Sequence, residues 1–255
     1  MIKYIGIDGC RGGWIAVYIE NGEVSVRVES AKRKENSKEA KGLEAFGFTK
    51  DDVILIDMPI LSAEGKRNNL DQVLRNEMQK NGNKGSVFSI PDDLLKDVGG
   101  RLLINEDVLK TTSEQLKGIA EKIEETCNFA KKSIEFKFWE SHPEFCFELL
   151  KKEKAPLLKK KSGGGIAERL LILQEYLGIR GINTLLKKAK DLKEKDFDFD
   201  DLLDAACLAV MAKEIGFNGL EKIVPIENSK SKEKKISEKI EYPFIAYAIN
   251  PAKKD

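Results

Sequence analysis

Three consecutive segments in the first part of the chain have the pattern of β-strands, and they constrain the fold more than any other feature. They are residues 3–8, 13–20 and 23–29. Asn21 and Gly22 separate the second and third segments, and this pair favours the tight turn of a β-hairpin. Such short connections predict adjacent antiparallel strands, because parallel pairing needs a much longer crossover.

A continuous apolar run ending in Asp57 predicts a fourth strand, over residues 53–57, that is covered on both faces. The polar stretch before it, residues 31–45, suits a surface helix. A strand reached through a helical crossover usually lies parallel to an earlier strand. If it pairs with the 3–8 strand, Asp8 and Asp57 lie at neighbouring carboxyl ends, where open α/β sheets bind ligands.

The rest of the chain has a mainly helical pattern with two further strands. Helices are expected at about 69–80, 91–97, 112–131, 145–152, 166–178, 182–192 and 196–216, and strands over 134–144 and 242–249. Residues 228–240 read as a solvated loop rich in Lys, Glu and Ser. No internal repeat and no linker divides the chain, which predicts a single domain over residues 1–255.

Composition narrows the functional classes. The 44 basic and 43 acidic residues leave a net charge of +1, whereas proteins that bind phosphate backbones usually carry a basic excess. Acidic residues gathered in a metal site can cancel a basic surface in the net charge, so nucleic acid remains a possible partner. No apolar run is long enough to span a membrane, and the chain starts without a secretory leader, so we expect a cytoplasmic protein. The sequence does not indicate an oligomeric state.

Five acidic residues are candidates for catalysis or metal binding. They are Asp8, Asp57, Glu144, Asp201 and Asp204. Asp8 or Asp57 alone would read as a turn cap, but two acids at adjacent strand ends favour a functional site. Asp201 and Asp204 share one helix face, and Asp204 lies among small and apolar residues, where an acid needs a partner. Ser141 and Glu144 form a capping box, so Glu144 is either a helix cap or a further carboxylate beside Asp8.

Carboxylates brought this close resist ionisation unless cations neutralise them. Hard oxygen ligands select Mg²⁺ or Mn²⁺, and a pair of such ions can hydrolyse a phosphodiester. The loop with Arg11, Gly12 and Gly13 has few side chains and would let a phosphate approach Asp8. Arg67 and Arg75 are further candidates for phosphate binding, although a solvated face explains either of them equally well.

Seven motifs in order resemble those of an uncharacterised family of predicted RNase H-like nucleases. They are GIDGCRGGWIAV, IDMPI, the R-x₃-D-x₃-R of Arg67, Asp71 and Arg75, SVF, SHPEFCFELL, GGGIAERLLIL and DDLLDAACLA. The resemblance covers about residues 2–249. It implies an RNase H-like α/β fold, with a mixed five-stranded sheet flanked by helices and with helical insertions at about 61–135 and 151–195.

An Asp on the first strand, an acid on the fourth strand and a D-x-x-D-A motif on the last helix resemble the RuvC-type resolvases and their relatives, which extends the resemblance to site residues. It implies that Asp8 bridges two Mg²⁺ or Mn²⁺ ions and that Asp57 takes the fourth-strand position. Asp201 and Asp204 would complete the metal site, whereas Glu144 has no counterpart in that scheme.

The sequence therefore predicts a metal-dependent nuclease that acts on nucleic acid of unknown type. The alternative is a nucleotide-binding phosphotransferase or ATPase of the actin and sugar-kinase type. Those proteins also begin with a strand, an Asp and a glycine-rich hairpin, but they need the motif in two related halves. No second such hairpin follows residue 130, which favours the nuclease.

Overall fold

A mixed five-stranded sheet forms the centre of the computed structural model. Its strand order is β3-β2-β1-β4-β7, and the strands are β1 (Tyr4–Cys10), β2 (Gly13–Glu20), β3 (Glu23–Ser30), β4 (Val53–Asp57) and β7 (Lys137–Glu140). The first three strands form an antiparallel meander, and β4 and β7 run parallel to β1. The predicted α/β class and the mixed sheet of an RNase H-like fold are confirmed.

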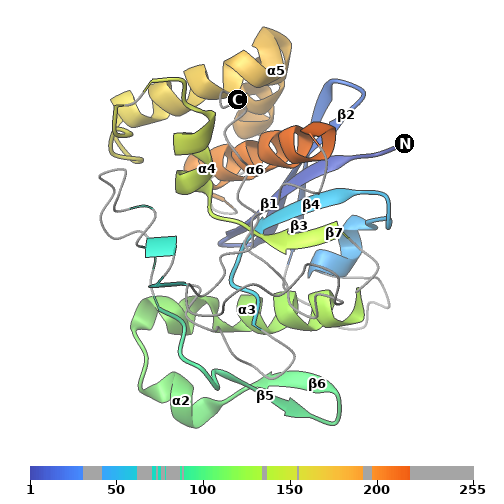
Figure 1. Cartoon of the computed structure of the whole chain (residues 1–255), viewed down its shortest axis with the longest axis vertical. Helices are drawn as coiled ribbons and strands as arrows, with labels where there is room; N and C mark the ends of the chain where they lie inside the picture. The colour runs from blue at the N-terminus through green and yellow to red at the C-terminus, as the bar shows by residue number, and fades with distance from the viewer. Residues whose placement is uncertain are drawn as a thin grey trace, which may run out of the picture.

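The structure describes residues 1–30, 42–61, 71–72, 74–75, 78, 87, 89–133, 137–153, 155–191 and 197–218. The remaining elements are the 3₁₀-helix η1 (Gly42–Phe46), the strands β5 (Leu95–Val98) and β6 (Arg101–Ile104), and the helices α2 (Glu106–Lys110), α3 (Glu114–Lys132), α4 (Pro143–Leu150), α5 (Gly163–Asp191) and α6 (Phe199–Asn218). Helices α4, α5 and α6 lie on one side of the sheet and α3 lies on the other, with α2 and the β5–β6 hairpin beyond α3 (Figure 1).

Two apolar clusters sandwich the sheet, because successive side chains of a strand point to opposite faces. Ile5 and Ile7 of β1 join Ile54 and Ile56 of β4 in the cluster on the α3 side. Val53 and Leu55 of β4 pack in the cluster with α6. The same alternation directs Asp8 and Asp57, at the ends of these strands, toward α6.

Helix α6 lies directly against β1, and Gly6 makes this approach possible. A Cβ atom at Gly6 would collide with the backbone oxygen of Ala205 and the backbone nitrogen of Ala209. The alanines keep the helix surface flat at this contact, and both are fully buried. The small residues of the motif DDLLDAACLA thus let α6 pack closely on β1, and this packing buries Asp204 between the helix and the sheet.

Several predicted elements differ from the structure. The helix expected over 91–97 is wrong, because Leu95–Val98 is a strand paired with β6 through Gly99 and Gly100, whose φ angles are 63° and 87°. The insertion between β4 and β7 is therefore only partly helical. The two helices expected over 166–178 and 182–192 form one element, α5, which is broken at Gly178 (φ 65°, ψ 174°).

The other expectations are met in part or lie outside the described residues. The strand expected over 134–144 is confirmed only at Lys137–Glu140, since α4 begins at Pro143. The described residues of the 69–80 segment are helical. Residues 31–41, the loop 228–240 and the closing strand 242–249 lie outside the described residues. No helix in the described part of the chain has the length and apolar character needed to cross a membrane.

Candidate metal centre

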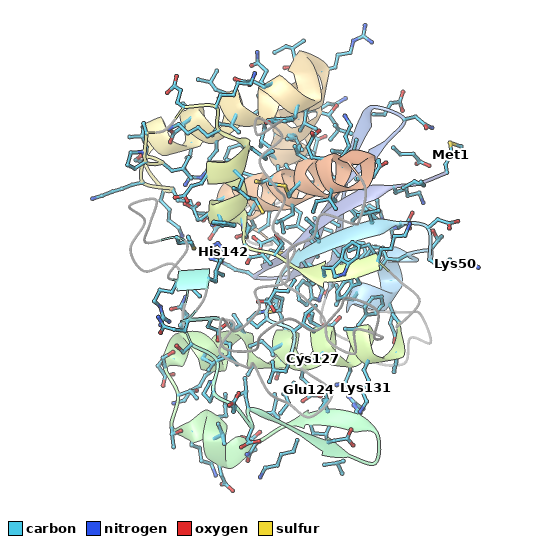
Figure 2. All side chains as sticks on the ribbon, viewed as in Figure 1. Met1, Lys50, Glu124, Cys127, Lys131 and His142 are labelled. Atoms are coloured by element: carbon cyan, nitrogen blue, oxygen red, sulfur yellow. The ribbon has the colours of Figure 1, made fainter. Side chains whose placement is uncertain are left out.

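Asp8 and Asp57 face each other across the pairing of β1 and β4. The two strands are parallel, and Asp8 is the register partner of Asp57. In Figure 2, Met1 and Lys50, which precede β1 and β4, lie on one side of the view, and His142, just after β7, lies toward the other side. Asp8 Oδ1 also accepts the backbone N–H of Gly9 at 2.7 Å. The carboxyl ends of β1 and β4 therefore place two carboxylates side by side.

Asp204 reaches the same place from α6. Asp204 precedes Ala205, which contacts β1 at Gly6. The packing of α6 on β1 therefore places the Asp204 carboxylate next to the strand ends. One oxygen from each of Asp8, Asp57 and Asp204 lies within 4.8 Å of the others. Asp204 is 1% exposed, and its Oδ1 is buried with no hydrogen-bond partner. An orphaned oxygen among carboxylates is a donor set that fits Mg²⁺ or Mn²⁺.

The three carboxylates disfavour each other's ionisation when no cation is bound. Burial raises the pKa of Asp8 well above its usual 3.8, and the charges of Asp57 and Asp204 raise it further. Burial raises the pKa of Asp57 to about 7 and that of Asp204 to about 8, although Lys160 acts in the opposite direction on both. A positive charge at the cluster is therefore needed to keep all three ionised near neutral pH.

Lys160 supplies one positive charge, and the sequence analysis did not identify it. Its ammonium group forms an ion pair with Asp204 Oδ2 and lies 3.5 Å from Asp200 Oδ2. Burial lowers the pKa of Lys160, but the adjacent Asp204 carboxylate more than reverses this effect, so its pKa is raised overall. Lys160 stands in a run of three lysines, 44 residues before Asp204 in the chain, and no local pattern marks it.

A sequence comparison places the chain in a family. The model for proteins of unknown function DUF429 matches residues 6–228. The chain belongs to the DUF429 family. The matched region contains Asp8, Asp57, Asp204 and Lys160, so the whole acidic site lies within it. No curated protein and no solved structure matches the chain.

Glu140 is a second residue of the DUF429 region that the sequence analysis missed. It ends β7, its register partner is Ile56, and its carboxylate accepts the backbone N–H of Ile60 at 2.7 Å. It thereby fixes the segment that leaves β4 just after Asp57, and its charge helps to raise the pKa of Asp57. The rule that selected Asp8 and Asp57, an acid at the end of a parallel strand, applies equally to Glu140.

Glu144 lies outside the group of three carboxylates. Both of its oxygens accept hydrogen bonds from the Arg169 Nη2 at 2.7 Å. Arg169 is 1% exposed, donates also to the carbonyls of Leu158 and Gly165, and stacks on Phe147. The N-cap of α4 is His142 rather than the expected Ser141, and the His142 side chain makes no capping bond. Glu144 thus serves as the counterion of a buried arginine.

Asp201 also lies outside that group, although it is near enough to raise the pKa of Asp8. Its Oδ2 accepts the backbone N–H of Asp198 at 2.8 Å, a bond typical of a helix start. Burial raises the pKa of Asp201, and this backbone bond partly offsets the effect. Asp201 therefore combines a structural bond at the start of α6 with a place beside the cluster.

The candidates for phosphate binding are engaged in other interactions or lie outside the described residues. Arg11 pairs with Asp198 at 3.2 Å, which joins the β1–β2 loop to the start of α6. Burial raises the pKa of the Cys10 thiol to about 11, and the backbone N–H groups of Gly12 and Gly13 act in the opposite direction. Gly13 is the register partner of Cys10 where the β1–β2 hairpin closes.

Asp71 and Arg75 of the R-x₃-D-x₃-R motif hold backbone in the described structure. Asp71 Oδ2 accepts the N–H of Ile90 at 2.7 Å, and Arg75 donates to the Val87 carbonyl at 3.0 Å and to Ser89 Oγ at 3.0 Å. Arg67 lies outside the described residues. The described part of the motif therefore ties a helical segment to the chain at 87–90.

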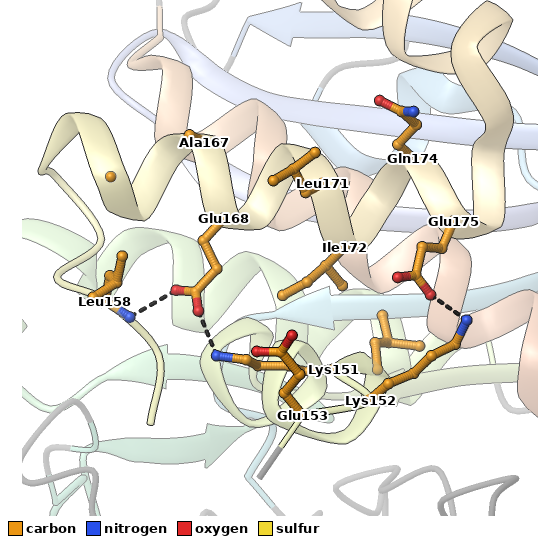
Figure 3. A pocket seen from close by; sticks show the side chains of 12 residues that line it. Lys151, Lys152, Glu153, Leu158, Ala167, Glu168, Leu171, Ile172, Gln174 and Glu175 are labelled. Atoms are coloured by element: carbon orange, nitrogen blue, oxygen red, sulfur yellow. Dashed lines mark hydrogen bonds and ion pairs between the residues drawn. The ribbon is translucent and has the colours of Figure 1, made fainter. Parts of the chain in front are cut away.

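A surface cavity of about 780 Å³ lies along α5 (Figure 3). Ion pairs of Lys151 with Glu168 and of Lys152 with Glu175 cross it, and Leu158 and Leu171 are exposed in its wall. None of the three clustered carboxylates lines this cavity. Its lysines are already paired, so the cavity offers no evident site for a phosphate.

Proposed function

We propose that this DUF429 protein is a nuclease that hydrolyses phosphodiester bonds of nucleic acid with Mg²⁺ or Mn²⁺. One observation carries the proposal: one oxygen from each of Asp8, Asp57 and Asp204 lies within 4.8 Å of the others, at the carboxyl ends of two interior strands of an RNase H-like sheet. The resemblance of the ordered motifs to predicted RNase H-like nucleases points to the same chemistry.

Each carboxylate has a distinct role in the proposal. Asp8, between Asp57 on the neighbouring strand and Asp204 on α6, would contact both ions of a two-ion site. Asp57 and Asp204 would each complete one side, with Asp201 next to Asp8. When bound, two such ions activate water and offset the charge that develops on the leaving oxygen.

The surrounding residues keep this arrangement rigid. Glu140 holds the backbone beyond Asp57, and the Asp198–Arg11 pair holds the start of α6 against the β1–β2 loop. The ion pair between Glu144 and Arg169 fixes α4 to α5 beside the cluster. Preorganised ligands need little rearrangement when the metal binds, which favours catalysis.

The test is cleavage of a panel of oligonucleotides by the purified protein with Mn²⁺. The panel contains single-stranded, duplex, hybrid and branched DNA and RNA, and ATP is assayed in parallel. We expect cleavage of at least one nucleic acid, no ATP hydrolysis, and a loss of more than about 100-fold in Asp8→Asn and Asp204→Asn, because even groups that only support metal ligands are worth 10- to 100-fold.

Asp107→Asn is the matched control, since Asp107 is an exposed helix acid that pairs with Lys110 at 3.5 Å. This variant should cleave like the wild type. An inert panel together with hydrolysis of ATP would overturn the nuclease and favour a phosphotransferase or ATPase.

A further inference from the structure

Lys160 pairs with one oxygen of Asp204, and the other oxygen of the same carboxylate is the donor that a divalent cation would use. It belongs to the segment between α4 and α5, and its ammonium contacts Asp204 Oδ2 and approaches Asp200 Oδ2 at 3.5 Å. Asp200 and Asp204 are one helical turn apart on α6, so Lys160 lies along their shared face. The other oxygen of Asp204 is buried without a partner, although its neighbours are carboxylates.

The next residue, Lys161, differs from Lys160 in its exposure and in the acids that it reaches. Its side chain is 78% exposed and reaches only Asp200, at 3.7 Å, whereas the side chain of Lys160 is 31% exposed. The two lysines are chemically identical neighbours, and only Lys160 touches the cluster. Lys161 is therefore a built-in control for any effect of the charge of this segment.

Two cations cannot share the Asp204 carboxylate without a cost. A divalent ion bound between Asp8, Asp57 and Asp204 would lie within a few ångström of the Lys160 ammonium, and like charges at that distance repel strongly where little water screens them. Lys160 enters the site from a loop, on a long and partly exposed side chain, so it can move outward by changing rotamer alone.

We propose that Lys160 is a positioning residue that competes with the divalent ion for Asp204, so that metal binding releases its ammonium to the rim of the site. Without metal, the Lys160 ammonium favours the ionised form of Asp204 and holds its side chain in place. With metal bound, the released ammonium lies at the rim of the site, where it would attract an approaching phosphate. The inference rests on the proposed function for the presence of a metal, but its test needs no nucleic acid.

The first measurement is the affinity of the protein for Mn²⁺, by calorimetric titration, in wild type, Lys160→Met, Lys160→Arg and Lys161→Met. Loss of the competing charge should tighten Mn²⁺ binding about tenfold in Lys160→Met, a typical size for coupling between two sites. Lys160→Arg keeps the charge and should bind like the wild type, as should Lys161→Met. A circular dichroism spectrum of each variant verifies folding.

The second measurement reads the position of Lys160 directly in the wild type. An amine-acetylating reagent with mass spectrometry should label Lys160 slowly without metal and several-fold faster in saturating Mn²⁺. Labelling of Lys161 should not change. A lysine with a purely structural role would keep the same labelling rate, so this readout remains informative even if Lys160→Met fails to fold.

The outcomes separate this inference from the nuclease proposal. Equal Mn²⁺ affinity in wild type and Lys160→Met, or metal-independent labelling, overturns the competition and leaves the nuclease untouched. Tighter binding in Lys160→Met together with an inert oligonucleotide panel supports the competition and removes the nuclease. If no protein in the set binds Mn²⁺, both are overturned.

Discussion

At the scale of single residues, the acids around the site are balanced in three different ways. Asp204 is paired with Lys160, Glu144 with the buried Arg169, and Glu140 accepts a backbone N–H. Asp8 and Asp57 face one another across two strand ends, and burial raises the pKa of both. Burial costs a charged group much more than a neutral one, so these two acids are where a bound cation would change the protein most.

The raised pKa of Asp57 predicts a pH dependence of stability in metal-free protein. Its folded pKa, about 7, exceeds the usual 3.8, so the folded state binds more protons than the unfolded state between these values. The stability that Asp57 contributes is fully present below about pH 4 and is lost as pH rises through about 7. Asp57→Asn does not titrate, so its free energy of unfolding should rise relative to wild type by about 2–4 kcal/mol from pH 4 to pH 8.

Urea unfolding with a chelator across this pH range measures the difference, and Asp107→Asn serves as the control because Asp107 is an exposed surface acid. Parallel pH profiles for wild type and Asp57→Asn would show that Asp57 is ionised normally and that the cluster carries no excess repulsion.

Glu144 gives a second residue-scale prediction. Glu144→Gln leaves the Arg169 guanidinium, which is 1% exposed, without its counterion, and an uncompensated buried charge costs about 3–5 kcal/mol. We expect a large loss in the free energy of unfolding, with Mn²⁺ affinity changed little. Urea unfolding and metal titration of the same variant check both parts. Normal stability together with lost metal binding would instead identify Glu144 as a ligand.

The sequence contained enough to predict three of the clustered acids, but not their partners. Asp8 and Asp57 end apolar strands, and Asp204 interrupts an apolar helix face, which are local signals. Lys160 and the Arg169 partner of Glu144 are known only from tertiary contacts, 44 and 25 residues from the acids they pair with. Charged residues are common on surfaces, so nothing in a lysine run distinguishes the half-buried Lys160 from its exposed neighbours.

At the scale of elements, the site depends on how closely α6 approaches β1. Gly6 of β1 contacts Ala205 and Ala209 of α6, and both strand ends beyond this contact carry acids. The small residues on both sides let the helix backbone lie against the strand. The arrangement of the three acids is therefore sensitive to a substitution two residues away from Asp8 that touches no carboxylate.

Gly6→Ala tests this dependence. The added Cβ would collide with α6 backbone, which cannot move aside as a side chain can, so we expect a destabilisation of about 3 kcal/mol and weaker Mn²⁺ binding. Gly118→Ala is the matched control, since a Cβ there meets open space on α3 and should stabilise the helix by up to about 1 kcal/mol. Equal thermal stability of the two variants would contradict the close packing of α6 on β1.

The meander, the buried strand and α6 were predictable because each has a strong local pattern, whereas β5 and β6 were not. Leu95 and Leu102 are buried against the α3 layer, and their short strands alternate too briefly to be distinguished from a helical turn. The Gly99–Gly100 pair was the signal that was overlooked, because two successive glycines favour a hairpin turn.

At the scale of the whole molecule, the sheet separates two layers with different roles. The α3 side holds an apolar cluster and the β5–β6 hairpin, and the opposite side carries α4, α5 and α6, which together deliver Asp204, Lys160 and the Glu144–Arg169 pair (Figure 1). The described residues between β4 and β7 therefore build mainly the support, whereas the ends of β1 and β4 and the segments after β7 build the site. That the chain forms a single domain remains a prediction.

The central claim is that Asp8, Asp57 and Asp204 bind a divalent metal ion, and a crystal grown with Mn²⁺ tests it most directly. Anomalous scattering from manganese locates the ion without reference to any activity. We predict a peak at about 2 Å from oxygens of all three carboxylates, with the Lys160 ammonium displaced from Asp204. A well-ordered cluster with no manganese peak at saturating Mn²⁺, or with ions bound only elsewhere, would contradict it.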